Sequence, residues 1–375
     1  MITVENHVFV IFGATGDLCK RKLLPSLFDL YIRGLLPKSY LIIGCGRKNI
    51  TNKIFLKKSI IDNKNLINIK YIGKKAKINK FKKHIVYNKI DPNNKNDFIF
   101  LKQNLNTHFK NNNINNRNVL FYFSTPPSAF QNIIKNLTLM NLNNESNGWK
   151  RLIIEKPFGD NLKSCKNLNT LLKKNFKEKQ LYRIDHYLGK ETVQNILISR
   201  FSNIIFNALW NRKFVSYVEI TAAEKIGIEE RGEYYDNAGA IKDMFQNHLL
   251  ELLCLTAMEE PKDNSSESIR DEKIKVLQKI KNIDYKNHIV RGQYTKSEIS
   301  EKSFKGYRDN KGVNKRSKTE TFFACKLFIE NERWKNVPFF IRTGKRLPTK
   351  VTEIVVNFKK NNNVFNDNFQ LVLFS

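Results

Sequence analysis

Cysteine pairs, long apolar runs and acidic residues are all scarce in this sequence of 375 residues. Its five cysteines are odd in number and widely spaced, without a Cys-x-x-Cys pair, which argues against a disulfide framework and a metal centre. No apolar run reaches the roughly 18 residues of a membrane-spanning helix, and the first residues have no basic segment followed by an apolar one. We therefore expect a cytoplasmic protein that holds no metal and does not contact a membrane.

Because acidic residues are scarce, the net charge is +31, from 66 Lys and Arg against 35 Asp and Glu. Such an excess raises nucleic acid as a partner, and that alternative predicts binding with a steep dependence on salt. The lysines are diffuse, however, and mixed with asparagine and isoleucine, which share A- and T-rich codons and fill residues 111–116. The base composition of the gene accounts for this charge, whereas a polyanion site would need basic patches interleaved with aromatic side chains. We expect no nucleic acid partner.

A strand, a glycine turn and a helix open the chain. Residues 8–12 form a short apolar run, as expected of a buried parallel strand, and residues 20–31 place five apolar side chains on one helical stripe. Between them stands the run Gly13-Ala14-Thr15-Gly16-Asp17-Leu18. Glycines at such a turn let backbone N–H groups approach a pyrophosphate at a helix N-terminus, although an ordinary strand-to-helix turn is the alternative. The pattern predicts a dinucleotide-binding turn.

Further apolar runs at residues 41–45, 119–123 and 151–154 alternate with helical patterns. This alternation predicts a parallel sheet with helices on both faces, an α/β coenzyme domain of the Rossmann type. After the second strand an NAD enzyme would offer Asp or Glu to the ribose hydroxyls, whereas this chain offers Gly46-Arg47-Lys48. Because an arginine suits a 2′-phosphate, Arg47 favours NADP as the cofactor.

The pattern changes beyond about residue 185. Three segments alternate in polarity like half-exposed strands: 215–222, 321–329 and 351–358. With a long helix expected from about residue 237 to 258, they predict an α+β domain with a large, mainly antiparallel sheet. We place the boundary so that residues 1–185 bind the cofactor and residues 186–375 bind the substrate. Two stretches rich in Asn and Lys are predicted to be loops: 88–118 and 299–318.

Charged and aromatic residues gather at this boundary, in the run Asp185-His186-Tyr187-Leu188-Gly189-Lys190. His186 and Lys190 are four apart and would share one face of a helix, although such a pair is often only a solvated face. The run Glu155-Lys156-Pro157-Phe158-Gly159 brings Lys156 to the carboxyl end of the sheet. Together these side chains are suited to an anionic, phosphorylated substrate.

His248 lies in the apolar helical run Gln246-Asn247-His248-Leu249-Leu250. On periodicity alone, a lone histidine there is more often a core residue than a catalyst. A dehydrogenase that acts on a carbon bearing a hydroxyl group needs a base with a pKa near the working pH, and histidine at about 6.5 supplies one. Asp185 could fix its tautomer and stabilise the imidazolium. A cofactor turn, a base and an anion cluster in one chain predict a dehydrogenase.

Six motifs, in order along the whole chain, resemble those of the glucose-6-phosphate dehydrogenase family. They are GATGDL at 13–18, EKPFG at 155–159, RIDHYLGKE at 183–191, QNHLL at 246–250, VRGQY at 290–294 and VPFFIRTGKRL at 337–347. The resemblance implies oxidation of glucose 6-phosphate at C1 to 6-phosphoglucono-δ-lactone with hydride transfer to NADP, the first step of the oxidative pentose phosphate pathway. It also implies a homodimer or tetramer.

The resemblance further implies a role for each matching residue. His248 would take the proton of the C1 hydroxyl with Asp185 as its partner, and His186, Tyr187 and Lys190 would hold the phosphate. The other residues implied on the substrate side are Lys156, Glu224, Asp236, Lys345 and Lys350. Those implied on the cofactor side are Gly13, Thr15, Gly16, Asp17, Leu18, Lys22, Arg47 and, through the position of the nicotinamide, Lys156.

Members of the family continue by roughly a small domain beyond the end of this sequence, so we expect the C-terminal part of the second domain to be missing. The lysine and asparagine tract at 359–363 suggests a frameshift as the cause. An inactive remnant of such an enzyme is therefore one alternative, which an activity assay and thermal melting would distinguish. Another NADP-dependent sugar oxidoreductase is a second, which substrates with and without the 6-phosphate would distinguish.

Overall fold

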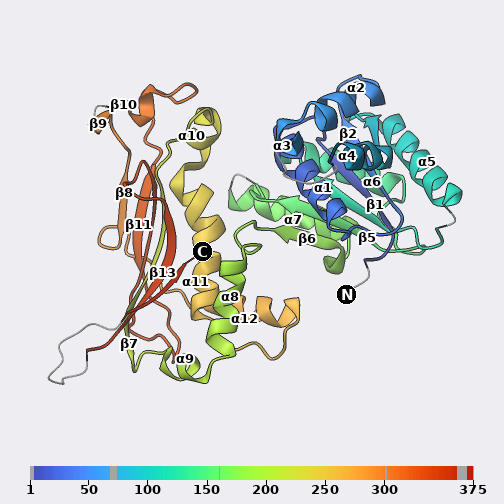
Figure 1. Ribbon diagram of the computed structural model, residues 1–375. Helices are drawn as coiled ribbons and strands as arrows, with labels where there is room; N and C mark the ends of the chain where they lie inside the picture. The colour runs from blue at the N-terminus through green and yellow to red at the C-terminus, as the bar shows by residue number, and fades with distance from the viewer. Residues whose placement is uncertain are drawn as a thin grey trace. The chain divides into compact units, whose positions relative to one another are not determined.

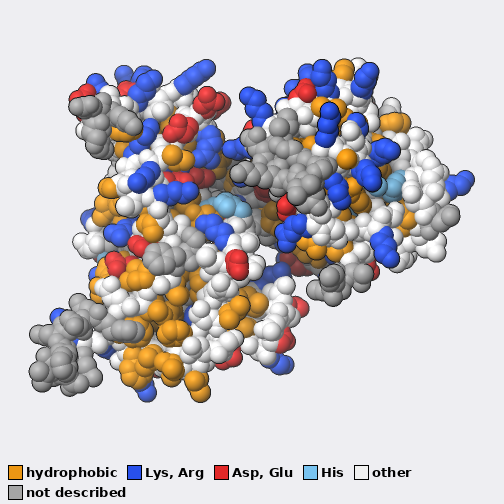
Figure 2. All heavy atoms as spheres, in the orientation of Figure 1, with side chains coloured by type: hydrophobic (Ala, Val, Ile, Leu, Met, Phe, Trp, Pro, Cys, Tyr) orange, Lys and Arg blue, Asp and Glu red, His pale blue; other side chains and the backbone are white. Residues whose placement is uncertain are grey.

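The computed structural model describes residues 4–67, 74–112, 114–159, 161–299, 302–360 and 370–374. The chain divides into two compact units, Met1–Ile184 and Asp185–Ser375, and each is described by itself. None of the described helices is long and apolar enough to cross a membrane. On the face in view, Lys and Arg side chains are scattered over both units rather than gathered on one surface (Figure 2).

The first unit is a six-stranded parallel sheet in the order β3-β2-β1-β4-β5-β6 (Figure 1). Its strands are β1 (His7–Phe12), β2 (Tyr40–Gly46), β3 (Ile85–Lys89), β4 (Val119–Phe123), β5 (Lys150–Glu155) and β6 (Leu181–Ile184). Because β1 pairs with both β2 and β4, the order of the strands reverses at its carboxyl end. Ligands of open α/β sheets bind at such a reversal.

Helical segments cover both faces of this sheet. They are η1 (Cys19–Leu23), α1 (Leu24–Ile32), α2 (Asn52–Leu56), η2 (Lys57–Ile61), α3 (Lys64–Ile67), α4 (Lys74–Phe81), η3 (Lys82–His84), α5 (Lys95–Asn111), η4 (Pro127–Ala129), α6 (Phe130–Leu139), α7 (Leu162–Asn175) and η5 (Glu178–Gln180). Side chains of β1 alternate between two cores. Val10 packs in the core that contains residues of α5, α6 and α7, whereas Ile11 packs in the core that contains residues of α1, α2 and α4. The expected parallel sheet with helices on both faces is confirmed.

The prediction of a loop at 88–118 was wrong, because α5 fills most of it. Four of its apolar side chains, Phe98, Leu101, Leu105 and Phe109, recur at helical spacing and are buried against the sheet. Each contributes roughly 1.5–3 kcal/mol by leaving water. Asn94 begins the helix, since its side chain accepts a hydrogen bond from the backbone N–H of Asn96. Most Asn and Lys of this segment lie on the exposed face of the helix. Because they dominate its composition, composition alone predicted a loop and did not reveal the apolar stripe.

The second unit contains a six-stranded sheet in the order β14-β13-β7-β12-β11-β8 and a separate hairpin. The strands of the sheet are β7 (Val215–Glu224), β8 (Ile289–Gly292), β11 (Phe322–Leu327), β12 (Phe339–Lys345), β13 (Val351–Phe358) and β14 (Gln370–Phe374), and the hairpin joins β9 (Ser297–Ile299) to β10 (Lys302–Phe304). All neighbours in the sheet are antiparallel except β7 and β12. The mainly antiparallel sheet of the prediction is confirmed.

Helices α8, α10 and α11 lie on one face of this sheet (Figure 1). The helical segments of the unit are α8 (Glu191–Phe201), α9 (Ile204–Leu209), α10 (Gly232–Ala240), η6 (Ile241–Leu249), α11 (Leu250–Ala257), α12 (Ser266–Gln278) and η7 (Tyr307–Asp309). The loop predicted for 299–318 was therefore wrong in part, because it contains the strand β10 and the turn η7. Residues 300 and 301 of that prediction lie outside the described residues.

The long helix predicted from about 237 to 258 is confirmed over Ile241–Ala257, as η6 followed by α11, but its predicted start was wrong, because Gly239 interrupts it. Gly239 has φ 66° and ψ 176°, a conformation that separates α10 from η6. A Cβ at this position would stand 2.5 Å from Oε1 of Glu320. That carboxylate accepts the backbone N–H of Ile241 at 3.0 Å, so an acidic side chain from another segment begins η6. A periodic pattern of side chains does not report such a backbone break.

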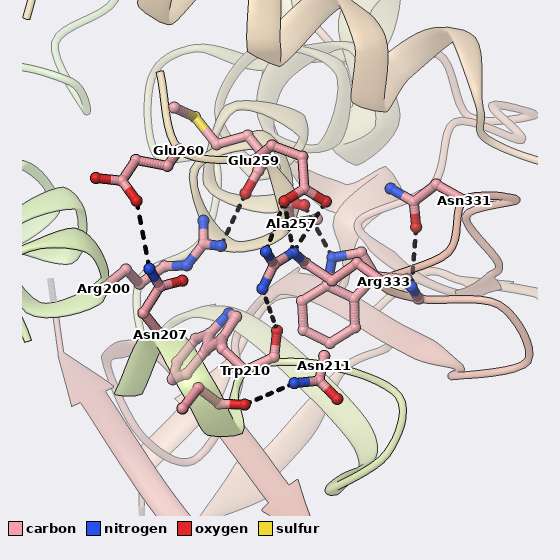
Figure 3. A network of polar contacts seen from close by, with 12 residues as sticks. Arg200, Asn207, Trp210, Asn211, Ala257, Glu259, Glu260, Asn331 and Arg333 are labelled. Carbon is pink, nitrogen blue, oxygen red and sulfur yellow. Dashed lines mark hydrogen bonds and ion pairs between the residues drawn. The ribbon is translucent and has the colours of Figure 1, made fainter. Parts of the chain in front are cut away.

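At its other end, α11 is closed by side chains from α8, from the residue that follows α9 and from the loop before β12. The last four carbonyls of a helix have no partner within the helix. Here Arg200 donates to the carbonyls of Leu255 and Met258, both at 2.7 Å. The indole N–H groups of Trp210 and Trp334 donate to the carbonyls of Thr256 and Ala257, both at 2.8 Å. Around them, Arg333 binds Glu259 and the carbonyl of Trp210, and Asn207 binds Glu260 (Figure 3).

Candidate active site

The glycine turn of the first unit is shaped by close contact with two strands. Gly13 has φ 88°, and a Cβ there would stand 2.1 Å from the carbonyl oxygen of Ser124, just after β4. The N–H groups of Gly13 and Ala14 both donate to the carbonyl of Cys45 on β2, at 2.9 and 3.0 Å. Only glycine fits position 13, and the turn is fixed over the point where the strand order reverses.

The other predicted cofactor residues surround this turn or line a small cavity beside it. Gly16 is exposed, and among its neighbours only the carbonyl of Gly13 would meet a Cβ there. Asp17 forms an exposed ion pair of 3.1 Å with Arg21. Lys22, on η1, and Arg47, directly after β2, are exposed, and Thr15 is partly buried. Leu18 and Lys156 line a cavity of about 170 Å³ at the carboxyl ends of β4 and β5.

Two residues that the sequence interpretation missed line the same cavity. The hydroxyl oxygens of Ser124 and Thr125 are buried and have no hydrogen-bond partner among the described residues. Buried polar atoms are normally paired, so two unused hydroxyls beside a glycine turn fit a polar ligand such as a dinucleotide. Their position directly after β4, at the reversal of strand order, was the available signal.

In the second unit, His248 on η6 meets Asp185, the residue that follows β6. His248 Nδ1 lies 2.7 Å from Asp185 Oδ1, and both side chains are buried. The same carboxylate oxygen accepts the N–H of Tyr187 at 2.9 Å. The ring of Tyr187 stacks on the imidazole at 4.2 Å, with 12° between the planes. A carboxylate that accepts Nδ1–H leaves Nε2 of the neutral ring as an acceptor, so this packing fixes both the tautomer and the orientation.

His186 and Lys190 lie in a tight turn rather than in the helix that their spacing allowed. The turn is closed by the N–H of Leu188 donating to the carbonyl of Asp185 and that of Lys190 donating to the carbonyl of Tyr187, both at 3.1 Å. The His186 ring lies 4.5 Å from that of His248. Partial burial, and secondarily the nearby His248, lower the pKa of His186.

A cavity of about 510 Å³ opens beside this turn. It is lined by Tyr187, Lys190, Ala222, Ala223, Glu224, Lys350, Val351 and Thr352. The ammonium of Lys190 stands 3.8 Å over the ring of Tyr187. Burial first, and then the positive charge of Lys350, lower the pKa of Lys190. Two lysines that repel each other across a cavity form a site that an anion would stabilise.

Two further predicted residues, Glu224 and Lys345, form an ion pair across the parallel strands β7 and β12, where they are register partners. Asp236 differs, because its carboxylate is occupied. It accepts hydrogen bonds from the Tyr307 hydroxyl at 2.9 Å, from the Ser317 hydroxyl and from the Asn314 N–H at 3.2 Å. Burial alone would raise the pKa of Asp236, but these bonds outweigh it and lower the pKa.

The sequence interpretation missed two more residues of this unit. Thr352 lines the same cavity as Tyr187 and Lys190. Asp243 stands one turn before His248 because η6 is a π-helix, and its charge acts on His186 and Tyr187. Asp185, His186 and His248 also bring ligand-type atoms within 4.8 Å of one another. Asp185 Oδ1 is already engaged, however, because it accepts the N–H of Tyr187 and pairs with Nδ1 of His248.

A parallel-sheet unit with a glycine turn after its first strand, together with a buried histidine–carboxylate pair beside a cavity that two lysines line, fits the class of nicotinamide-dependent oxidoreductases. Residues 10–195 match the family model "Glucose-6-phosphate dehydrogenase, NAD binding domain", and residues 197–372 match "Glucose-6-phosphate dehydrogenase, C-terminal domain". The chain belongs to the glucose-6-phosphate dehydrogenase family, whose coenzyme is NADP.

Similar proteins extend over nearly the whole chain. Glucose-6-phosphate 1-dehydrogenase of Treponema pallidum is 44% identical over 367 residues, 95% of this chain and 70% of that protein. The enzyme of Aggregatibacter actinomycetemcomitans is 45% identical over 95% of this chain and 72% of its own length. A solved glucose-6-phosphate dehydrogenase in complex with its substrate glucose 6-phosphate is 34% identical, with a TM-score of 0.88 over 99% of this chain and 81% of that one.

Proposed function

We propose that His248 is the general base of this enzyme, which oxidises glucose 6-phosphate at C1 to 6-phosphoglucono-δ-lactone. NADP, when bound, supplies the acceptor for the hydride of C1. The observation that carries the proposal is the buried 2.7 Å pair of His248 and Asp185, beside a cavity lined by cations. With Nδ1 engaged, Nε2 takes the proton of the C1 hydroxyl, and Asp185 stabilises the imidazolium that results.

The substrate phosphate binds, in this proposal, among Lys190, Lys350, His186 and Tyr187. Lys190 and Lys350 face one cavity and disfavour each other's charge, so a phosphate dianion relieves their repulsion. Glu224 lines the same cavity, where its carboxylate oxygens can accept hydrogen bonds from sugar hydroxyls. The ion pair with Lys345 holds this carboxylate in place. Asp236 acts from the surroundings, by holding the segment that contains Tyr307 and Ser317.

The cofactor side of the proposal rests on the first unit. Gly13 and Gly16 shape the turn that receives the pyrophosphate, and Arg47 meets the 2′-phosphate. The other residues proposed to hold NADP are Thr15, Asp17, Leu18, Lys22 and Lys156, and the hydroxyls of Ser124 and Thr125 join them as donors. We also propose that Lys156 binds the sugar.

We further propose that the enzyme is a cytoplasmic homodimer or tetramer. The sheet of the second unit has helices on one face, and apolar side chains such as Phe340 and Val290 are exposed. Exposed apolar side chains of this kind often mark a protein interface. Light scattering of the purified chain measures the mass, and a monomer at all concentrations would contradict this part of the proposal.

The test of the function is formation of NADPH by the purified chain, with the variant His248→Asn beside it. The variant should lose about 10³-fold in kcat, since a general base contributes roughly 10²–10⁴-fold, with the KM for glucose 6-phosphate little changed. His288→Asn is the matched control, because His288 belongs to the same unit but lies outside the pair and its cavity. A folded wild-type chain without turnover would contradict the function, and full turnover by His248→Asn would contradict the role of the base.

A second candidate, an oxidoreductase of another sugar, predicts turnover that does not need the phosphate. Unphosphorylated glucose tests it directly. The lysines around the cavity favour the phosphorylated substrate, so kcat/KM should fall by about 10³-fold or more without the phosphate.

A further inference from the structure

A second cavity of the Asp185–Ser375 unit has a lining rich in hydrogen-bond donors and has no part in the proposed reaction. Its volume is about 280 Å³, and it shares no lining residue with the cavity around Tyr187. Arg346, Lys305 and Tyr294 line it, together with Phe304 and three polar residues. None of the described lining residues is acidic, so the positive charges face the cavity without a compensating carboxylate.

The backbone at Arg346 is in a conformation that few side chains adopt. Arg346 has φ 56°, in the left-handed region, and its N–H donates to the carbonyl of Ile226 at 3.2 Å. Non-glycine residues hold such a conformation only where their surroundings impose it, and they concentrate at binding sites. Its effect here is to separate two consecutive cations. Lys345 turns to Glu224, whereas Arg346 turns to the second cavity.

The guanidinium of Arg346 is held in place but not satisfied. It stacks over the ring of Phe304 at 4.9 Å. Its Nε is buried and has no hydrogen-bond partner among the described residues. Gly227 makes room for it, because a Cβ at that position would stand 2.9 Å from Nε. A buried donor without a partner is an exception in proteins, and here the free donor belongs to a cation that borders a cavity.

Two neighbours add donors to the same space. The hydroxyl oxygen of Tyr294 accepts the N–H of Ile228 at 3.4 Å and Nδ2 of Asn310 at 3.5 Å. Since the oxygen is the acceptor in both bonds, neither uses the proton of the hydroxyl. Lys305 is exposed, and the structure gives it no ion pair with a described residue. A guanidinium, an ammonium and a phenol therefore converge on one cavity.

We propose that this cavity binds a small phosphate-bearing anion, either free phosphate or the terminal phosphate of a small metabolite. The planar fork of an arginine matches two phosphate oxygens at once. Lys305 adds the second positive charge that a dianion requires, and Tyr294 donates to a third oxygen. None of its lining residues is among those proposed to hold NADP, so the site is a separate one from the proposed cofactor site.

Calorimetric titration of inorganic phosphate and of glycerol phosphate into the full chain tests the proposal, at constant ionic strength and with glucose 6-phosphate and NADPH present, a pair that fills both proposed sites without reacting. Arg346→Gln should weaken the binding of phosphate by about tenfold or more, because it removes a charge-assisted hydrogen bond. Lys305→Gln should weaken it less, by about threefold. Tighter binding of glycerol phosphate than of phosphate would identify a metabolite as the source, and the reverse would identify the free ion.

Arg316→Gln is the matched control, because it removes the same charge from an exposed site of the same unit outside the cavity. Its affinity for phosphate should equal that of the wild type. Gly227→Ala should weaken binding without any change of charge, because the new methyl group displaces the guanidinium. Equal affinities of the wild type, Arg346→Gln and Lys305→Gln would overturn the proposal whether or not the enzyme turns over glucose 6-phosphate. Lys305 is exposed, so its variant keeps the test decisive if Arg346→Gln does not fold.

Discussion

The two parts of the helical segment formed by η6 and α11 treat their polar groups in opposite ways. In η6, near the middle of the segment, His248 is buried with one ring nitrogen held by Asp185, and the other is proposed to act on the substrate. At the end of α11, the carbonyls of residues 255–258 accept hydrogen bonds from Arg200, Trp210 and Trp334. The comparison teaches that η6 keeps a polar group available for chemistry, whereas the end of α11 satisfies its polar groups for stability.

This difference predicts that activity and stability respond separately along one helical segment. Changes at the pair of His248 and Asp185 should lower kcat while the fold persists. Changes at the end that Arg200 closes should lower the free energy of unfolding while the kinetic constants of the folded enzyme persist. The predictions below test that separation, beginning with the largest effect.

The largest effect is expected for Asp185→Asn. An amide can still accept the N–H of Tyr187, but it no longer stabilises the imidazolium of His248 and can hold the ring in the wrong tautomer. We expect a loss of about 10³-fold or more in kcat, measured by formation of NADPH. The control is Asp284→Asn, which changes an exposed carboxylate of the same unit. If the melting temperature also fell by many degrees, activity and stability would not respond separately at this site.

The next effect concerns Arg200→Met. The substitution leaves the carbonyls of Leu255 and Met258 buried without donors, which costs roughly 1–3 kcal/mol each, and the gain from removing a desolvated charge offsets part of this. We expect about 3 kcal/mol less free energy of unfolding, measured by denaturant titration. Arg200 is 1% exposed, so little water can replace it as a donor to these carbonyls. Arg212→Met is the control, because Arg212 forms an exposed ion pair with Glu332 and should change stability by less than about 1 kcal/mol. Equal losses in both variants would contradict the special role of the closed end.

A smaller effect is expected for Trp334→Phe. The ring of phenylalanine fills most of the same space but cannot donate to the carbonyl of Ala257. One buried acceptor without a partner costs roughly 1–3 kcal/mol, so we expect about 2 kcal/mol less free energy of unfolding. The same titration measures it, and Trp210→Phe should behave alike because its indole N–H donates to the neighbouring carbonyl. A change in the KM for glucose 6-phosphate, with stability unchanged, would reverse the assignment.

Local patterns predicted the parts of the fold that neighbouring residues determine. The apolar run at residues 8–12 lies within β1, and that at 119–123 coincides with β4. The strand and the glycine turn around Gly13 could be predicted from local sequence, because the backbone conformation at Gly13 is set by steric contacts with the adjacent strands. The predicted boundary after residue 185 differs by one residue from the division after Ile184.

Features that depend on distant residues were beyond the same reasoning. Asp185 and His248 are 63 residues apart, so their contact depends on how the second unit folds as a whole. Their pairing was suggested by chemistry and by family resemblance, not by spacing. The break at Gly239 depends on Glu320, which is contributed by a remote segment. That the hydroxyls of Ser124 and Thr125 are buried without a hydrogen-bond partner among the described residues can be seen only in the structure, because it depends on the positions of all the surrounding atoms.

The smallest effect is a pH dependence that sharpens the comparison, because it isolates His186, the polar group next to the ring of His248. In the free enzyme, partial burial and then His248 hold the pKa of His186 below its usual value of 6.5. If the imidazolium helps to hold the phosphate dianion, that pKa rises when glucose 6-phosphate binds. Binding then takes up a proton between the two pKa values, so affinity strengthens as the pH falls through this window.

The KM for glucose 6-phosphate should therefore fall by about threefold between pH 8 and about pH 6, where the phosphate itself begins to gain a proton. In His186→Gln the KM should be higher at low pH and nearly independent of pH over the same range. The measurement is a pH profile of KM at constant ionic strength, with kcat recorded in parallel. A profile of the same steepness in His186→Gln would assign the proton to another group. Lys190, whose pKa is lowered by burial and by the charge of Lys350, is the nearest alternative.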